Sequence, residues 1–513
     1  MMVAMTRLAI GTAFLSALLL WAASPTLGAG WLAWIALVPV AVIVLSAPRT
    51  RAARLAVPLA YVAYLELLLV PALPFGLAEG QWGDAPFGVL IGGSPVLAVA
   101  LVAIPLFGLL LYALRFGQPW GADLLGPRLH PLAVVLVPAF AWTGLDLLRA
   151  KLEPGGSWGP LFLSQLDTPA SELAALGGPW LVTLAIVAFN YGLALAVVRR
   201  RPLPALAPAI AIVAALVLGT AVEKDEPEGR PVTVAAIQPG YDTAEDETEP
   251  GLLRYWDEGT FNLAARDLIR DLGGMTRRAA RDGAELVVWP EAVAFVDLRG
   301  RAGARAALLR VSRSSGVTIL APYFDHAGRS GAAFAVSPRG SVTAPRPKQR
   351  AMWFLGEQGD ATAGPRPLRA AGTRLGTLLG VDVQDPNLPR LLAAGDAEVI
   401  ASSTHDWRQL AIQHRALAAL GAEASGVPVV RADWRYGSAI YDREGETIAD
   451  AGEDRRRTVV AAELRAGSPT PYARLGDAVG WVSLGAAAAA WLAAAGSAIA
   501  TRRRRIPAEA EAS

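Results

Sequence analysis

The stretch Leu286-Val-Val-Trp-Pro-Glu291 places an apolar run directly before a proline and a carboxylate. The run has the length and composition of a buried strand, and Pro290 cannot continue a hydrogen-bonded ladder. Glu291 is therefore expected at the carboxyl end of a strand, where α/β sheets gather their ligand-binding groups. A carboxylate in that position also commonly serves as a cap or an ion-pair partner, so the stretch alone leaves both interpretations open.

The sequence around this stretch alternates between strand-like and helix-like segments. Helices are expected at 260–281 and 408–424, which are rich in Arg and Ala. Strands are expected at 232–237, 285–289, 317–321, 375–379, 397–401 and 427–430. Strands separated by helices predict an α/β domain, and the polar region that contains them covers residues 223–475.

Long apolar runs flank this domain on both sides. A membrane-spanning helix needs about 20 apolar residues. Runs of this kind lie near 7–23, 28–47, 54–74, 92–114, 131–149, 174–198, 203–222 and 476–500. We therefore predict a membrane domain of seven spans (1–222), one C-terminal span (476–500) and a cytoplasmic tail (501–513). The composition, 53% hydrophobic and 18% charged, excludes a wholly soluble protein, for which about 45–50% and 25% are usual.

The placement of basic residues predicts the orientation of these spans. With a cytoplasmic N-terminus, the short outside loops carry only Arg149 and Lys151. The inside segments carry thirteen arginines: Arg7, Arg49, Arg51, Arg54, Arg115, Arg128, Arg199 to Arg201 and Arg502 to Arg505. Basic residues concentrate on the cytoplasmic side, so region 223–475 is expected outside the cytoplasm. ATP and CoA are absent there, and an enzyme would take its activated group from a lipid or from its substrate.

The residue counts exclude several kinds of chemistry. The chain has no cysteine, which excludes disulfides, thiolate metal sites and a cysteine nucleophile. The net charge of +2 is close to neutral, so we expect no polyanionic partner such as a nucleic acid. The four histidines show no metal-ligand spacing, and there is no glycine-rich phosphate loop, so we expect neither a metal nor a cofactor. Only three of the 47 basic residues are lysines: Lys151, Lys224 and Lys348.

Several motifs in order along the chain resemble the apolipoprotein N-acyltransferases of bacterial membranes, which belong to the nitrilase superfamily. These motifs are Trp142–Arg149, Gly155–Trp158, Leu173–Trp180 with Asn190, Ala236–Pro239, Tyr255–Gly259, Trp289–Glu291, Ser403–Trp407, Gln413–His414, Ala422–Glu423, Pro428–Arg431 and Gly437–Ile440. The resemblance covers nearly the whole chain. It implies a nitrilase-like α-β-β-α sandwich outside the cytoplasm, carried by a multi-span helical domain in the bacterial inner membrane.

The resemblance also implies a reaction and its residues. In the family, a cysteine takes an acyl chain from a phospholipid and passes it to the α-amine of a diacylglyceryl lipoprotein. Glu291 corresponds to the general base and Lys348 to the lysine that stabilises the oxyanion. Glu357 resembles a further site glutamate, although Leu355 is inserted before it. Trp256, Val381 and Asp382 correspond to substrate-binding positions.

The nucleophile of the family is missing. Pro386 and Arg390 fix the register of the segment that carries it, and this register puts Gly380 at the cysteine position. A glycine has no side chain with which to attack, so the thioester route is closed to this chain. We still expect Glu291 and Lys348 to converge on the backbone at Gly380.

Three interpretations remain open. The first, which we favour, is a degenerate homologue that binds phospholipid or lipoprotein without catalysis, as a monomer. The second is an acyltransferase that transfers directly or uses a replacement nucleophile, for which the nearest candidates are Asp382, Ser402, Ser403 and Thr404. The third is an unrelated membrane role, as a scaffold or a transport-associated protein.

Overall fold

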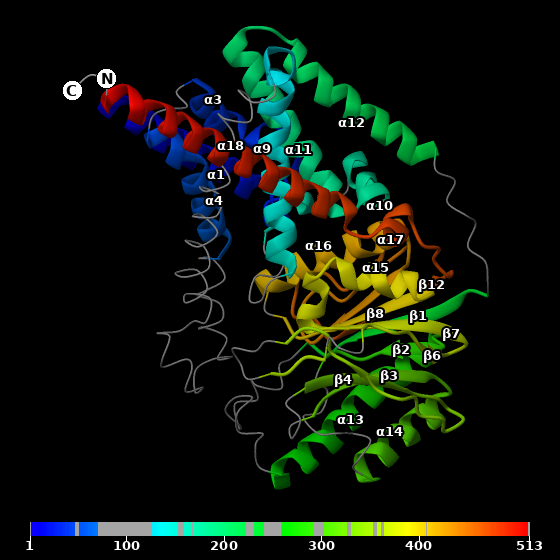
Figure 1. Ribbon diagram of the computed structural model, residues 1–513. Helices are drawn as coiled ribbons and strands as arrows, with labels where there is room; N and C mark the ends of the chain where they lie inside the picture. The colour runs from blue at the N-terminus through cyan, green and yellow to red at the C-terminus, as the bar shows by residue number, and fades with distance from the viewer. Residues whose placement is uncertain are drawn as a thin grey trace.

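A group of apolar helices lies above a two-sheet sandwich (Figure 1). The computed structural model describes residues 2–46, 51–69, 126–151, 159–166, 168–221, 230–240, 258–291, 302–325, 330–351, 357–360, 364–406 and 408–510. The helical group consists of α1 (Met2–Ala23), α2 (Ala33–Ala36), α3 (Val38–Ser46), α4 (Arg51–Leu69), α9 (Gly126–Lys151), α10 (Leu173–Gly177), α11 (Pro179–Arg199), α12 (Leu203–Ala221), α17 (Pro471–Leu475) and α18 (Ala478–Ala510).

Three stretches of the described helices are long and apolar enough to cross a membrane. They are Met5–Ala23, Pro131–Lys151 and Pro179–Arg199, which correspond to the predicted spans 7–23, 131–149 and 174–198. Shorter apolar stretches occupy Gly30–Ser46, Leu55–Leu65, Leu203–Val217 and Ala478–Ala493. Within the described residues the structure thus shows three candidate spans, and the predicted count of seven plus one is not confirmed. The predicted span 92–114 lies outside the described residues.

Two predicted spans are interrupted. The span 28–47 breaks at Leu37, between α2 and α3, because Pro39 has no N–H and its ring excludes the carbonyl four residues earlier. The Leu37 N–H donates to Asn190 Oδ1 at 2.8 Å, and Asn190 Nδ2 donates to the carbonyls of Ala33 and Ile186. This buried amide satisfies backbone groups that a bilayer cannot hydrate. The span 174–198 is divided at Gly178, whose φ of +76° separates α10 from α11.

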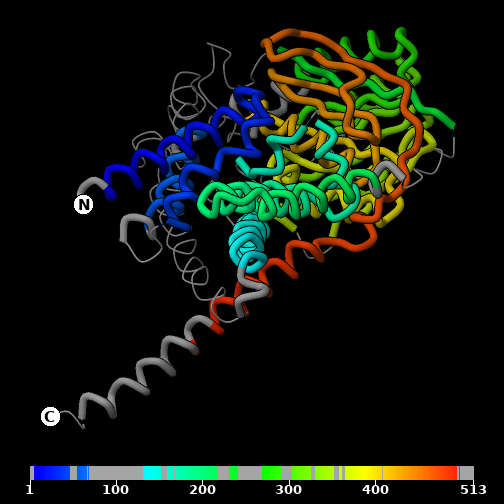
Figure 2. Tube along the Cα trace, turned by 90° about the horizontal axis from the view of Figure 1, so that it is seen from above, coloured from blue at the N-terminus to red at the C-terminus, as the bar shows by residue number. Residues whose placement is uncertain are grey.

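The last helix crosses α9 at close range. A Cβ on Gly144 of α9 would lie 2.7 Å from the Cα of Leu484 in α18, so only glycine permits this approach. Figure 2 shows α9 almost end-on, with α18 passing beside it. The crossing joins the C-terminal helix to the helices that precede the sandwich.

The sandwich consists of two six-stranded sheets. The first has the order β12-β1-β2-β3-β4-β5, with bounds β1 (Val232–Gln238), β2 (Leu286–Val288), β3 (Thr318–Asp325), β4 (Ser330–Val336), β5 (Arg346–Pro347) and β12 (Thr458–Leu464). The second has the order β11-β10-β9-β8-β7-β6, with bounds β6 (Leu368–Ala370), β7 (Thr373–Leu379), β8 (Val399–Thr404), β9 (Val429–Asp433), β10 (Ala439–Tyr441) and β11 (Thr447–Asp450). All six predicted strands are confirmed, within a few residues at their ends.

Alternate residues of each central strand face different layers. Val288 and Ala401 belong to the core between the sheets. Val287 belongs to the core beneath α13 (Glu258–Arg281) and α14 (Ala302–Ser315). Ile400 packs against α15 (Asn387–Ala394) and α16 (Arg408–Ser425), in a core that continues into the membrane helices. Both sheets are therefore covered on their outer faces, and the predicted α-β-β-α sandwich is confirmed.

Candidate active site

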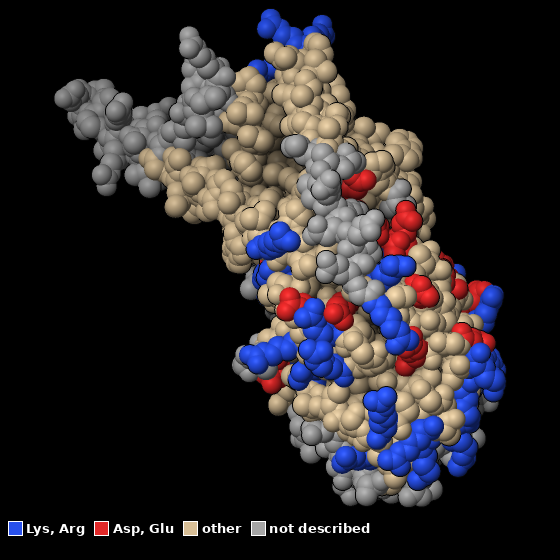
Figure 3. Space-filling view, turned by 90° about the vertical axis from the view of Figure 1, so that its right-hand side faces the viewer, with Lys and Arg blue, Asp and Glu red and all other residues tan. Residues whose placement is uncertain are grey.

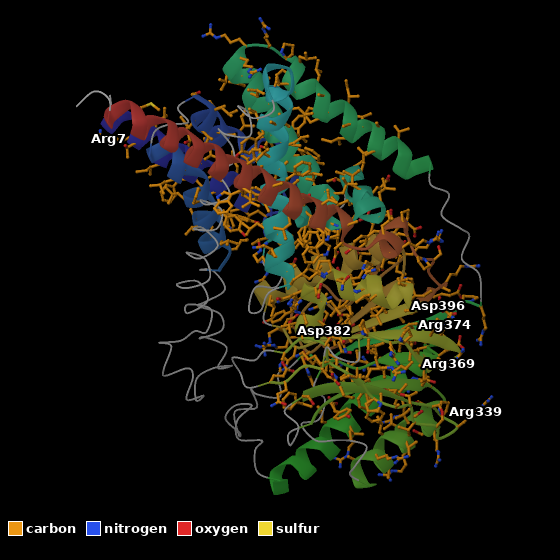
Figure 4. All side chains as sticks on the ribbon, viewed as in Figure 1. Arg7, Arg339, Arg369, Arg374, Asp382 and Asp396 are labelled. Carbon is orange, nitrogen blue, oxygen red and sulfur yellow. The ribbon has the colours of Figure 1, made fainter. Side chains whose placement is uncertain are left out.

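The site lies where three strands end. Glu291 follows β2, Lys348 follows β5, and Gly380 follows β7. Figure 4 labels Asp382, which comes two residues after Gly380, at the end of the sheets below α9, and labels Arg339, Arg369, Arg374 and Asp396 toward the opposite end. The sheets thus bring together residues that are far apart in sequence.

Lys348 is the centre of a buried ion cluster. Its Nζ lies 2.9 Å from Oε1 of Glu291 and 2.8 Å from Oε1 of Glu357. Only 1% of the Lys348 side chain is exposed, against 15% for Glu291 and 7% for Glu357. The structure therefore brings together all three charged residues that the sequence predicted for the site. Glu357 joins the cluster despite the inserted Leu355.

Burial and the neighbouring charges perturb this cluster. Burial raises the pKa of the Glu291 carboxyl, and the Lys348 ammonium offsets only part of this effect. Burial alone would lower the pKa of Lys348, but Glu291 and Glu357 hold it well above its ordinary value. Lys348 is therefore a persistent cation, suited to oppose a developing negative charge. Glu291 takes up a proton more readily than an ordinary carboxylate.

Two side chains position the backbone of the Trp289-Pro-Glu291 turn: Ser403, and Trp434, which the sequence did not single out. Ser403 Oγ donates to the Trp289 carbonyl at 2.8 Å, and Trp434 Nε1 donates to the Glu291 carbonyl at 2.6 Å. Trp434 is fully buried. A tryptophan one residue after β9 gives no local signal of this contact, which forms only when the two sheets pack.

Gly380 faces the Glu291 carboxylate directly. Its φ is +50°, a left-handed conformation that favours glycine. A Cβ at this position would lie 2.5 Å from Oε2 and 2.6 Å from Oε1 of Glu291. The predicted convergence of Glu291, Lys348 and the Gly380 backbone is thus confirmed. The carboxylate occupies the space in which a nucleophilic side chain would begin.

Asp382 connects the two chain segments of the site. Its carboxylate accepts hydrogen bonds from the N–H groups of Leu379, Gln349 and Arg350, at 3.0, 3.1 and 2.7 Å. Burial raises its pKa to about 7, although Lys348 and these N–H groups act in the opposite direction. Asp382 is 1% exposed and fastens the loop after Lys348 to the end of β7. Val381 beside it is half-buried, and Trp256 lies outside the described residues.

The four candidate replacement nucleophiles have other surroundings. Asp382 holds the backbone as described, and Ser403 donates to the Trp289 carbonyl. Thr404 Oγ1 donates to Asp433 Oδ2 at 2.7 Å. Ser402 is fully buried and lies two residues after Ile400, so its side chain faces α15 and α16 rather than Glu291. None of these groups points at the position beside Glu291.

A second polar network lies buried under α16. His414 Nδ1 lies 2.8 Å and an Arg431 nitrogen 2.6 Å from Oδ2 of Asp406. Burial raises the pKa of Asp406, but His414 and Arg431 outweigh it and hold that pKa at about 2. Gln384, from the turn that begins at Gly380, contacts the other ring nitrogen of His414 at 2.9 Å. Within the described part of the chain, no group of three His, Asp or Glu side chains is arranged to hold a metal ion.

The end of α9 is fastened to the site's own turn. Lys151 Nζ lies 2.8 Å from Asp477 Oδ2 and 3.5 Å from Asp385 Oδ1. Arg350 donates to the Ala150 carbonyl and pairs with Asp385, both at 2.9 Å. Arg350 therefore satisfies one of the carbonyls that the end of a helix leaves without a partner. The turn after β7 is thereby joined to a candidate membrane helix.

Comparisons with known proteins match both parts of the chain. A family model described as the apolipoprotein N-acyltransferase N-terminal domain matches residues 16–192, and one described as carbon-nitrogen hydrolase matches residues 233–471. The chain is similar to proteins named apolipoprotein N-acyltransferase in several bacteria. The Gloeobacter violaceus protein is 30% identical, over 94% of this chain and 93% of that protein. The Geobacter metallireducens protein is 26% identical, over 96% and 95%.

Other matches cover only part of the chain. The Pseudomonas putida protein of the same name is 30% identical over 44% of this chain, and the alignment spans about half of that protein's length, 45%. Among solved structures, a mutant of the Nesterenkonia AN1 amidase from the nitrilase superfamily covers 48% of this chain and 95% of its own, at 17% identity and a TM-score of 0.38. The regions that the two family models match, residues 16–192 and 233–471, correspond to the helical group and to the sandwich.

Proposed function

The chain belongs to the apolipoprotein N-acyltransferase family. We propose that it binds the lipoprotein substrate of that family's reaction and does not catalyse acyl transfer. In the family, a phospholipid is the acyl donor and a diacylglyceryl lipoprotein the acceptor. Three candidate membrane helices and the arginine bias support a place in the bacterial inner membrane, with the sandwich outside the cytoplasm.

The relation between Glu291 and Gly380 carries this proposal. A thioester route needs a thiol at position 380, and the chain has no cysteine. The Glu291 carboxylate fills the adjoining space, so a substrate carbonyl has no open position there. The hydroxyls and the carboxylate closest in sequence are engaged elsewhere or face another layer. Together these features support binding rather than group transfer.

The charge of the cluster favours the lipoprotein acceptor as the ligand. Two carboxylates, Glu291 and Glu357, surround one ammonium, Lys348, which leaves one negative charge in excess when all three groups are ionised. An excess carboxylate in a largely buried site favours a cationic group. The α-ammonium of a diacylglyceryl lipoprotein is such a group, whereas the phosphate of a phospholipid is not.

A synthetic diacylglyceryl cysteine lipopeptide with a free α-amine tests this proposal, with its N-acetylated form as the comparison. We expect the purified full chain to bind the free-amine form more tightly, and Glu291→Gln to remove this preference. Glu285→Gln is the matched control, because Glu285 pairs with Arg230 outside the cluster. Equal binding of the two lipopeptides would contradict the proposal.

Activity is measured in the same samples. When phospholipid is added, mass spectrometry should show no acylation of the lipopeptide. The chain should also fail to restore growth of a strain depleted of its own lipoprotein N-acyltransferase. Acylation by the unmodified protein would contradict this part of the proposal and would favour an acyltransferase that transfers directly or uses a replacement nucleophile.

A further inference from the structure

A groove in the helical group lies away from the site described above. Its volume is about 790 Å³, within the range of about 300–1,000 Å³ that is usual for ligand pockets. Helices α9, α11 and α12 form its walls, and nearly all of the lining is apolar. The residues that the argument uses are Leu132 and Val135 of α9, Ala188 of α11, Ala211 of α12, and Arg199 and Arg201.

Packing at one end of α12 explains why the groove exists. A Cβ on Gly192 of α11 would lie 2.7 Å from the Pro204 carbonyl and 2.8 Å from Pro208 Cγ. The two helices therefore touch near their connecting turn. From there α12 leans away from the group (Figure 1), and small residues such as Ala188 and Ala211 leave the space between the helices unfilled.

The polar end of the groove is cationic. Arg199 ends α11, and Arg201 precedes α12; both line the groove and are exposed. Figure 3 shows Lys and Arg gathered at the tip of the helical end, remote from the sandwich, above a surface with few other charges. Basic pockets between membrane helices, on the cytoplasmic side, are suited to acidic lipid headgroups.

We propose that this groove binds an anionic phospholipid, with its phosphate at Arg199 and Arg201 and an acyl chain between α9, α11 and α12. Leu132 and Leu203 are 49% and 72% exposed along the groove, and an acyl chain would cover them. The connecting turn and the sandwich lie at opposite ends of the helical group, so this lipid occupies the leaflet opposite the sandwich. It is thus separate from any ligand of the Lys348 cluster, and the proposal does not depend on the proposed function.

The charge specificity is tested with the full chain in a neutral detergent. Dioleoyl phosphatidylglycerol is compared with dioleoyl phosphatidylcholine, which has the same acyl chains, and native mass spectrometry measures the bound lipid. We expect phosphatidylglycerol to bind at least about fivefold more tightly. Arg199→Gln and Arg201→Gln should each weaken its binding by roughly fivefold, the effect expected for one basic residue near an acidic lipid.

Arg200→Gln is the matched control. Arg200 lies between the two arginines and is exposed, but it does not line the groove. Its left-handed φ of +51° is equally unfavourable for Gln, so this substitution changes only the charge. We expect less than a twofold effect, and an effect equal to that of Arg199→Gln would show diffuse charge attraction and overturn the proposal.

Ala211→Phe tests separately whether the apolar part of the groove holds the acyl chain, because it fills the groove and keeps both arginines. It should reduce the binding of both lipids, while the thermal midpoint of the lipid-free protein reports whether the variant folds. If Ala211→Phe misfolds, Ala188→Leu provides the same test from the α11 side. Equal binding of the two lipids by the unmodified protein, or full binding by a folded groove-filled variant, would overturn the proposal.

Discussion

The Glu291 carboxylate lies where the side chain of residue 380 would begin, since a Cβ on Gly380 would be 2.5 Å from Oε2 of Glu291. The lack of a side chain at position 380 and the position of the Glu291 carboxylate are thus two aspects of one arrangement. The ion pair between Glu291 and Lys348, at 2.9 Å, holds the carboxylate there.

Gly380→Ala should destabilise the fold by more than its backbone conformation alone explains. A left-handed φ in a residue with a Cβ costs about 1–2 kcal/mol, and the contact with Glu291 adds to this. Gly372→Ala is the matched control, because its φ is +83° and a Cβ there would meet nothing within 4 Å. Thermal unfolding of both variants measures the difference.

A double-mutant cycle isolates the contact. In a Glu291→Ala background, Gly380→Ala should lose only the backbone contribution, and the coupling free energy between the two positions should be about 0.5–3 kcal/mol, as for residues in contact. A coupling of zero would show that Glu291 moves aside freely.

Gly380→Cys should force the Glu291 carboxylate away from position 380, because the new side chain takes its space. The thiol beside Lys348 should then have room for an ester carbonyl, and it should take an acyl group from phospholipid as a thioester with release of a lysophospholipid. Because the chain has no other cysteine, any thioester or maleimide label reports on this position alone. Intact-protein mass spectrometry should show the adduct in Gly380→Cys and much less of it in Gly380→Cys with Glu291→Gln. These variants keep Asp382, because its carboxylate accepts hydrogen bonds from three backbone N–H groups that hold the site together.

Two results of this experiment would contradict the expected outcome. An acyl adduct on the unmodified chain would show that it has its own nucleophile. A cysteine at position 380 that is labelled by maleimide but never acylated would show that the pocket no longer admits a phospholipid acyl group.

Lys348→Met should destabilise the protein by about 3–5 kcal/mol at neutral pH, as expected when one partner of a buried ion cluster is removed. Burial already raises the pKa of Glu291 while the ammonium is present, so its pKa should rise further in the variant. A carboxyl with a raised folded pKa binds its proton preferentially in the folded state, so the variant should regain stability as the pH falls through that pKa. Thermal midpoints at pH 7.5 and 5 measure this.

Neutralising the whole cluster is the control. Lys348→Met combined with Glu291→Gln and Glu357→Gln removes all three charges of the cluster, while Asp382 keeps its three backbone N–H donors. This variant should recover most of the lost stability and most of the pH dependence should disappear. If the triple variant were as unstable as Lys348→Met, packing rather than charge would explain the effect.

Asp406→Asn should lower the free energy of unfolding at pH 7 by about 2–3 kcal/mol, since the pKa of Asp406 is held at about 2 against an ordinary value near 3.9. Because the pKa is lower in the folded state, the ionised Asp406 stabilises the fold fully above about pH 4, and this stabilisation is lost as the pH falls to about 2. The difference in the free energy of unfolding between Asp406→Asn and the unmodified chain should therefore narrow below pH 4. Asp454→Asn, at a side chain 74% exposed, should show no such difference at any pH.

Reporter fusions test the orientation. The arginine bias predicts that a reporter fused after Glu228 is active outside the cytoplasm, and that one fused after Arg505 is active inside. Activity on the other side at either position would show that the assigned orientation is wrong. It would also move Arg199 and Arg201 to the outer leaflet.

The sequence by itself determined the two-part architecture and predicted which residues share the candidate site. Spans such as 131–149 and strands such as 232–237 are local patterns of hydrophobic residues, and such patterns suffice because burial follows periodicity and length. The resemblance placed Glu291, Lys348, Glu357 and Gly380 in one site. The missing thiol was visible in the composition alone.

Only the tertiary structure decided how these residues meet. The contact of Glu291 with Gly380 joins the ends of β2 and β7, which belong to different sheets, and no local pattern encodes that distance. The same holds for Trp434 on the Glu291 carbonyl and for Asn190 at the break near Leu37. Such contacts depend on how sheets and helices pack across long separations in sequence, whereas periodicity records only which face of each element is buried.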